Sequence, residues 1–270
     1  MEIYQGVLLG ILQGVTEFIP VSSSGHLILG QHFFNMTESM IAFGISVHIG
    51  TLASIALVFF KDIKIICTSI FKPVSQKSDV KLLLLIITGS LPTLILGYII
   101  KIWEDVIFSS ILLVGCMLII TGTILWMTIN IQTTQTSQKK SMDTSEFTYR
   151  SAFIIGVVQG IAVIPGISRS GATIATGLFA GLDRKMAAKF SFLLSIPAII
   201  GAEFLQLSEV TNQPIIITKA TIFGTLASFI TGYIALILLL KIIDRGKLHI
   251  FAPYCWALGI STIIYNLISL

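Results

Sequence analysis

Hydrophobic residues gather along this chain in long runs with few charges, and six of these runs have the length of a membrane-spanning helix. They cover 40–60, 82–101, 107–129, 186–207, 216–241 and 250–270. A helix needs about 20 predominantly apolar residues to cross the hydrocarbon core of a bilayer. The pattern therefore predicts six transmembrane helices.

Two further apolar stretches, 3–34 and 151–182, are too long for one straight span and break at their centres. Each break contains a proline, Pro20 in the first and Pro165 in the second. Proline removes a helical hydrogen bond, and freed backbone groups inside a membrane must find partners within the protein. We expect each stretch to form a re-entrant pair of half-helices that enters and leaves on the same side.

The two broken stretches are copies of each other, offset by 146 positions. A gapless register places Gln13 on Gln159, Gly14 on Gly160, Ser22 on Ser168, Ser24 on Ser170 and Gly25 on Gly171. We interpret 1–130 as a first repeat, 131–150 as a polar cytoplasmic linker and 151–270 as a second repeat. Each repeat has a hairpin plus three spans, and three is odd, so the second repeat is expected to be inverted.

Positive charges favour one orientation of this all-α membrane fold. With the N-terminus outside, fourteen of the 17 Lys and Arg fall in inside loops, and only Lys101 and Lys219 fall outside. Cytoplasmic loops accumulate such residues. Both termini are therefore expected outside.

Composition excludes several other classes of protein. With 54% apolar and 11% charged residues, the chain cannot cover a soluble domain with polar surface. Its basic residues are scattered over loops, which argues against nucleic acid as a partner. Three cysteines without metal or disulfide spacing predict no chemistry, and the N-terminal segment lacks the features of a removable signal peptide.

The breaks hold the candidate chemistry. Glu17 and Arg169 are the only charges of the two broken stretches, and intramembrane charges normally face a partner or a water-filled cavity. Two readings are open: a buried pair that only locks the halves together, or a functional site. Ser-Gly helix starts beside an arginine favour a site for a phosphorylated ligand.

Two neighbours, His26 and Gln13, extend this candidate site. His26 follows the serines of the first break and could act as general base, nucleophile or ligand. Gln13 and Glu17 lie four residues apart on one helical face, and a carboxylate completed by substrate phosphates suits Mg²⁺ or Ca²⁺. We interpret His48 as a packing or interhelical hydrogen-bond residue, and we place Glu203 at the outer membrane interface, away from the site.

These motifs resemble those of a known family. Gln13-x-x-x-Glu17 with Pro20-Val21-Ser22-Ser23-Ser24-Gly25-His26, and Pro165-Gly166-Ile167-Ser168-Arg169-Ser170-Gly171, are similar to the two signatures of the bacterial undecaprenyl-pyrophosphate phosphatases. The resemblance spans essentially the whole chain. It implies a divalent-cation-dependent phosphatase of the bacterial inner membrane that converts undecaprenyl diphosphate to undecaprenyl phosphate, and so recycles the lipid carrier of peptidoglycan synthesis. It further implies an active site towards the outer face and bacitracin resistance on overproduction.

Carried over by position, the resemblance implies that Glu17 is the essential carboxylate and metal ligand, Ser23 and His26 are catalytic candidates, and Arg169 is the diphosphate clamp. Where the family carries Glu at its first acidic position, this chain has Gln13. We expect a divalent ion to bridge Glu17 and the diphosphate while His26 activates Ser23 or a water; direct attack by His26 is the variant. The expected substrate-binding residues are Gln13, Thr16, Ser22, Ser24, Gly25, Ser168, Ser170 and Gly171. For Thr16, Ser22 and Ser24, satisfying the broken backbone is an equal alternative.

Other functions compete with this prediction. Inverted repeats with broken helices are also typical of secondary transporters, so a polyprenyl-phosphate transporter or flippase is the main alternative. The acid-phosphatase-like lipid phosphatases share Ser-Gly-His, but this chain lacks their Arg-Pro and has Ala175 where they need a histidine. A structural scaffold would not need charged groups at helix breaks. The sequence leaves a homodimer open.

Overall fold

The fold is all-helical in the residues described by the computed structural model, which are 1–33, 41–69, 77–137, 147–209 and 217–268. The helices follow in the order α1 (Ile3–Phe18), α2 (Ser23–Phe33), α3 (Ile41–Val58), α4 (Phe60–Ser69), α5 (Lys77–Lys101), α6 (Glu104–Ser109), α7 (Ile111–Ser137), α8 (Tyr149–Ile161), α9 (Arg169–Phe179), α10 (Arg184–Glu209), α11 (Lys219–Asp244), the 3₁₀ turn η2 (Leu248–Phe251) and α12 (Ala252–Ile268).

Five of these helices are long and apolar enough to cross a membrane, and a sixth span results if α3 and α4 count as one bent unit. The five are α5, α7, α10, α11 and α12. All six predicted spans overlap these helices, so the chain is a multi-pass membrane protein. Helix α7 continues to Ser137 and so extends into the segment predicted as a linker, whose residues 138–146 lie outside the described part of the chain.

The bend between α3 and α4 was not predicted. The two helices meet at 81°, where the apolar run of 40–60 gives way to Lys61, Asp62 and Lys64. Asp62 accepts a hydrogen bond from Lys189 of α10 at 2.8 Å. The charged residues end the apolar span, and this ion pair holds α4 against α10.

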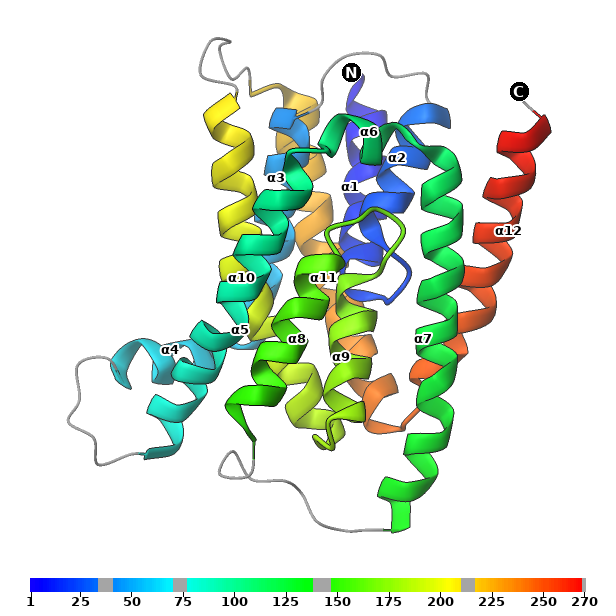
Figure 1. The fold of residues 1–270 in the computed structure, drawn as a ribbon. Coiled ribbons are helices and arrows are strands. Elements are labelled where there is room, and N and C mark those ends of the chain that lie inside the picture. Colours follow the sequence, from blue (N-terminus) through cyan, green and yellow to red (C-terminus); the bar gives the residue numbers. More distant parts are fainter. Residues whose placement is uncertain (34–40, 70–76, 138–146, 210–216, 269–270) are drawn as a thin grey trace.

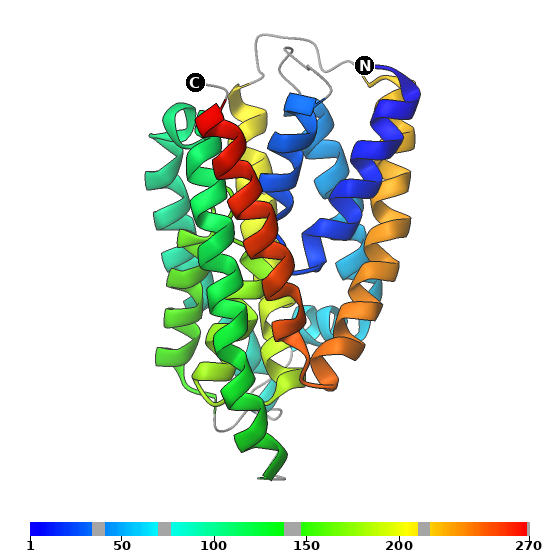
Figure 2. The same cartoon turned by 90° about the vertical axis from the view of Figure 1, so that its right-hand side faces the viewer.

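Two helical hairpins enter the bundle from opposite ends. Helices α1 and α2 hang from the end that carries both termini, whereas α8 and α9 rise from the other end, and their connections meet in the interior (Figures 1 and 2). Around this meeting point lies the largest apolar core, which includes Phe18, Phe59 and Phe192. The aromatic ring of Phe192 contacts those of Phe18 and Phe59 at centroid distances of 5.8 and 6.0 Å.

The first helix of each hairpin packs against a long helix from the other half of the chain. Helix α1 lies on α11, and α8 lies on α5. A Cβ atom added at Gly10 would lie 2.1 Å from the carbonyl oxygen of Gly224, and one added at Gly156 would lie 2.0 Å from that of Gly89. Only glycine permits such close backbone approach, as is common between membrane helices.

We expect Gly156→Ala to destabilise the fold, because its methyl group must push α8 away from α5. Overpacking of this kind costs about 1–3 kcal/mol, so the melting temperature of the detergent-solubilised protein should fall by several degrees. Gly44→Ala in α3 is the matched control, since its Cβ meets no atom within 4 Å. Equal melting temperatures for both variants would contradict the close α5–α8 contact.

Candidate active site

A proline and a left-handed serine form the first helix break. Helix α1 ends at Phe18, and Ile19 adopts an extended backbone (ψ 131°), as residues before a proline prefer. After Pro20, Ser22 has φ 69°. A non-glycine residue in this region costs on the order of 1–3 kcal/mol and persists only where its surroundings hold it.

The second break also has a residue with positive φ after its proline, but there it is a glycine that follows the proline directly. Gly166 follows Pro165 and has φ 97°. Ser168 then caps α9, its Oγ accepting a hydrogen bond from the backbone N–H of Gly171 at 3.1 Å. This cap fixes the start of α9 at Arg169.

Hydrogen bonds join the two breaks directly. The Gly166 N–H donates to Ser22 Oγ at 3.1 Å, and the Ser170 hydroxyl donates to the carbonyl oxygen of Phe18 at 2.9 Å. Thr121 of α7 adds a third support, because its hydroxyl accepts from the Ser168 N–H and donates to the Gly166 carbonyl. The backbone groups freed by the breaks thus bind each other, as the interior of a membrane requires.

Glu17 is the centre of the polar cluster that these contacts bring together. Its Oε1 forms an ion pair with the guanidinium of Arg169 across the two breaks. Its Oε2 accepts hydrogen bonds from Ser23 Oγ at 2.6 Å and from Gln13 Nε2 at 3.0 Å. The Glu17 and Arg169 side chains are only 6% and 17% exposed, so the interaction lies in an environment of low dielectric.

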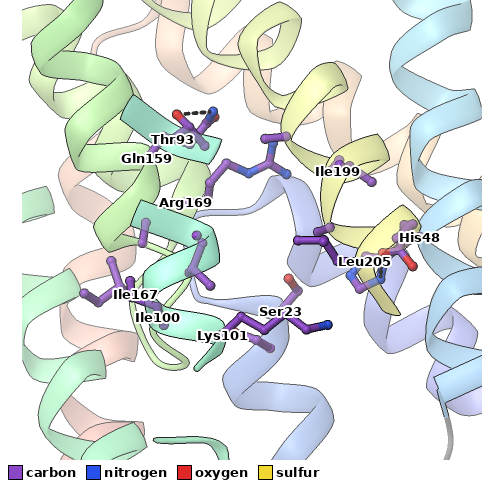
Figure 3. A pocket seen from close by; sticks show the side chains of 18 of the residues that line it. Ser23, His48, Thr93, Ile100, Lys101, Gln159, Ile167, Arg169, Ile199 and Leu205 are labelled. Carbon is purple, nitrogen blue, oxygen red and sulfur yellow. Dashed lines mark hydrogen bonds and ion pairs between the residues drawn. The ribbon is translucent and has the colours of Figure 1, made fainter. Parts of the chain in front are cut away.

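A cavity of about 250 Å³ opens beside this cluster (Figure 3). Polar residues at or next to the breaks line this cavity: Thr16, Glu17, Ser22, Ser23, Ser24, Ser168 and Arg169. The cavity continues along α5 and α6 past Tyr98, Lys101 and Glu104, towards the end of the molecule that holds both termini (Figure 1). A polar base with one arginine, together with apolar wall residues such as Leu94, Phe108 and Leu205, suits an amphiphilic ligand.

Several predicted binding residues serve the breaks instead of the cavity. The Gly171 N–H donates to Ser168 Oγ, and the Ser170 hydroxyl donates to the Phe18 carbonyl. The Gly25 N–H donates to Ser22 Oγ at 3.3 Å. None of these three residues lines the cavity. In this structure these three groups bond within and between the breaks, and the expectation that Gly171, Ser170 and Gly25 hold phosphate stays a prediction.

His26 also faces a different partner from the one expected. Its Nδ1 lies 2.7 Å from the Ser22 carbonyl oxygen, and its Nε2 lies 2.7 Å from the hydroxyl of Tyr254 in α12. The two rings are stacked at 5.8 Å. Both ring nitrogens are thus occupied away from the cavity, and Glu17 takes the place beside Ser23 that the sequence assigned to His26.

Two residues that the sequence kept outside the site belong to its walls. His48 of α3 and Glu203 of α10 both line the cavity, with His48 Nδ1 2.9 Å from Glu203 Oε1. The interhelical contact of His48 agrees with the prediction, whereas Glu203, which the sequence analysis left out of the site, lines the cavity. The available signal was the isolation of each residue within an apolar span.

Comparison with known proteins gives one consistent result. Residues 6–261 match the family model described as bacitracin resistance protein BacA. Undecaprenyl-diphosphatase of Desulforapulum autotrophicum is 49% identical over all of this chain and all of its own. The undecaprenyl-diphosphatases of Desulfosudis oleivorans (49% identity, 96% of this chain and 97% of its own) and Korarchaeum cryptofilum (41%, 97% and 98%) are similar over almost their full lengths.

We expect Ser22→Ala to destabilise the junction of the breaks, because the buried N–H of Gly166 loses its acceptor. Leaving such a group unpaired costs about 1–3 kcal/mol, measurable as a lower melting temperature in detergent. Ser46→Ala is the control, since the Ser46 hydroxyl bonds the carbonyl of Ala42 within its own helix. A stability loss no larger than that of the control would argue against the hydrogen bond between the breaks.

Proposed function

Since this chain belongs to the bacitracin resistance protein BacA family, we propose that the cavity beside Glu17 and Arg169 is where it hydrolyses undecaprenyl diphosphate to undecaprenyl phosphate and inorganic phosphate. The chain is an integral membrane phosphatase. One observation carries the assignment of the site: a serine hydroxyl, its hydrogen-bonded carboxylate and an arginine meet at the base of one cavity.

Arg169 holds the diphosphate in this proposal. A guanidinium carries five N–H donors in a planar fork that matches phosphate oxygens. Its ion pair with Glu17 uses the guanidinium nitrogen Nη2, so further donors remain for the cavity. The phosphate then shares the guanidinium with Glu17, and the guanidinium stabilises negative charge on the transferred group.

Ser23 is the nucleophile that the geometry supports best among Ser23, His26 and water. Its hydroxyl donates to Glu17 at 2.6 Å, and a nucleophile hydrogen-bonded to a carboxylate can pass its proton as it attacks. Ser23 Oγ bonds to the terminal phosphorus, the bond to the lipid-bearing phosphate breaks, and that phosphate leaves with the electron pair. Water subsequently releases inorganic phosphate from Ser23.

A divalent cation, Mg²⁺ or Ca²⁺, fits the donors beside Glu17. The Gln13 Oε1 is buried and has no hydrogen-bond partner among the described residues, so it offers an oxygen next to the carboxylate. Within the same residues, no group of three acidic, His or Cys side chains could enclose an ion. Glu17 and Gln13 would hold it with substrate oxygens, the usual arrangement for Mg²⁺. When bound, the ion neutralises charge on the diphosphate.

The two halves are proposed to form an inverted repeat with two re-entrant hairpins. Support comes from the hairpins entering at opposite ends (Figure 2) and from the matching contacts of α1 with α11 and of α8 with α5. The distribution of Lys and Arg supports both termini outside. In that orientation the cavity faces the outer side of the cytoplasmic membrane, where lipid diphosphate would be hydrolysed.

The first test of the site measures phosphate release from undecaprenyl diphosphate by purified protein. We expect Glu17→Gln, Ser23→Ala and Arg169→Ala each to lower kcat by at least 10²-fold, in line with loss of a proton acceptor, nucleophile or charge clamp. Asp62→Asn is the matched control, since Asp62 pairs with Lys189 away from the cavity. Transport of lipid phosphate without hydrolysis would favour the flippase alternative instead.

The second test concerns the cation. Chelation with EDTA should abolish phosphate release, and Mg²⁺ or Ca²⁺ should restore it. Gln13→Glu adds a carboxylate oxygen where Gln13 offers an amide oxygen, so we expect half-maximal activity at a severalfold lower cation concentration. Asp62→Asn should leave this concentration unchanged, and full activity after exhaustive chelation would exclude the proposed ion.

A further inference from the structure

His48 and Glu203 form a second polar pair on the wall of the cavity, opposite the helix breaks. Figure 3 shows His48 beside the same opening as Ser23 and Arg169. The pair joins α3 to α10, with side-chain exposures of 26% and 13%. Two charged or titratable groups on separate apolar spans are costly in a membrane unless they serve a site.

The orientation of the imidazole matches that of a histidine prepared to accept a proton. Its Nδ1 faces the Glu203 carboxylate at 2.9 Å, which leaves Nε2 as the ring nitrogen available to the cavity. A carboxylate at Nδ1 fixes the ring and stabilises the imidazolium that forms when Nε2 takes a proton. The contact is not yet aligned as a hydrogen bond, and such contacts commonly tighten when substrate binds.

The chemistry proposed above requires a second proton acceptor. During the attack by Ser23, its proton passes to Glu17, and the departing lipid phosphate needs no proton because it leaves as an anion. Glu17 is then a neutral acid. It can return a proton to Ser23, but it cannot also accept one from the water that must attack the phosphoserine.

We propose that His48, oriented by Glu203, accepts this proton and so activates water for hydrolysis of the phosphoryl group on Ser23; the inference rests on the proposed function. The water oxygen bonds to phosphorus and its proton passes to His48 Nε2. The bond from phosphorus to Ser23 Oγ breaks, and Ser23 Oγ takes the proton held by Glu17. Inorganic phosphate leaves, and His48 releases its proton to it or to solvent.

The charges around His48 are consistent with this role. Glu203 from α10, Glu17 from α1 and Arg169 from α9 are the charged groups that act on the imidazole. The two carboxylates favour the imidazolium formed in the step, whereas the like charge of Arg169 opposes it. The pair of Lys189 and Asp62 lies outside the cavity and is satisfied by itself. Glu203 is a positioning residue, since it acts through His48.

The experiment follows the terminal phosphate of a polyprenyl diphosphate labelled there with ³²P. For His48→Gln we expect one rapid release of lipid phosphate, equal to the amount of enzyme, with the label retained on the protein at Ser23. Steady-state phosphate release should fall about 10²-fold. For Glu203→Gln, steady-state phosphate release should fall about 10-fold. This variant should retain less label than His48→Gln. The wild type should retain almost none.

The controls separate this inference from the proposed function. His249→Gln, a histidine of η2 outside the cavity, should keep wild-type turnover and retain no label, and Ser23→Ala combined with His48→Gln should retain none. Wild-type turnover in His48→Gln and Glu203→Gln would overturn the role of the pair while leaving Ser23 as nucleophile. Loss of the first release of lipid phosphate in both variants would also overturn it. Full activity of Ser23→Ala alone would instead overturn the proposed nucleophile.

Discussion

The ion pair between Glu17 and Arg169 is the interaction on which the other features of the site depend. It joins two residues 152 positions apart in sequence, one beside each helix break. Each charge alone costs about 2.5–3.5 kcal/mol at the centre of a bilayer, and pairing reduces that cost only if both side chains are held in place. The prolines end α1 and shape the second break, and the cap of Ser168 fixes the start of α9 beside the carboxylate.

The serines of the two breaks divide into two groups with different tasks. Ser22 and Ser170 hold the breaks together through buried hydrogen bonds, whereas Ser23 faces the cavity and donates to Glu17. The same separation explains His26, whose ring supports the carbonyl of Ser22 and contacts Tyr254. A rigid junction of this kind allows one hydroxyl and one guanidinium to remain available for a ligand.

The sequence predicted the spans and the convergence of the breaks well, because both follow from local patterns. Apolar runs define helix length, and the polar repeat at 146-residue spacing marks the two breaks beside which Glu17 and Arg169 lie. The sequence did not predict the bend after Val58, the direction of the His26 side chain or the pairing of His48 with Glu203. These features depend on which helices become neighbours and on side-chain rotation, neither of which a single-chain pattern fixes.

The glycine contacts between the halves have a consequence for biosynthesis. Helix α1 packs its Gly10 face against Gly224 of α11, a helix near the end of the chain, and α8 packs against α5 of the first half. The first hairpin can therefore not reach its final packing until most of the chain has been translated and inserted. Such long-range contacts form late, so in the first half alone the Glu17 carboxylate has Ser23 and Gln13 as partners but lacks Arg169. The catalytic centre and the completed fold thus arise together, in the last stage of assembly.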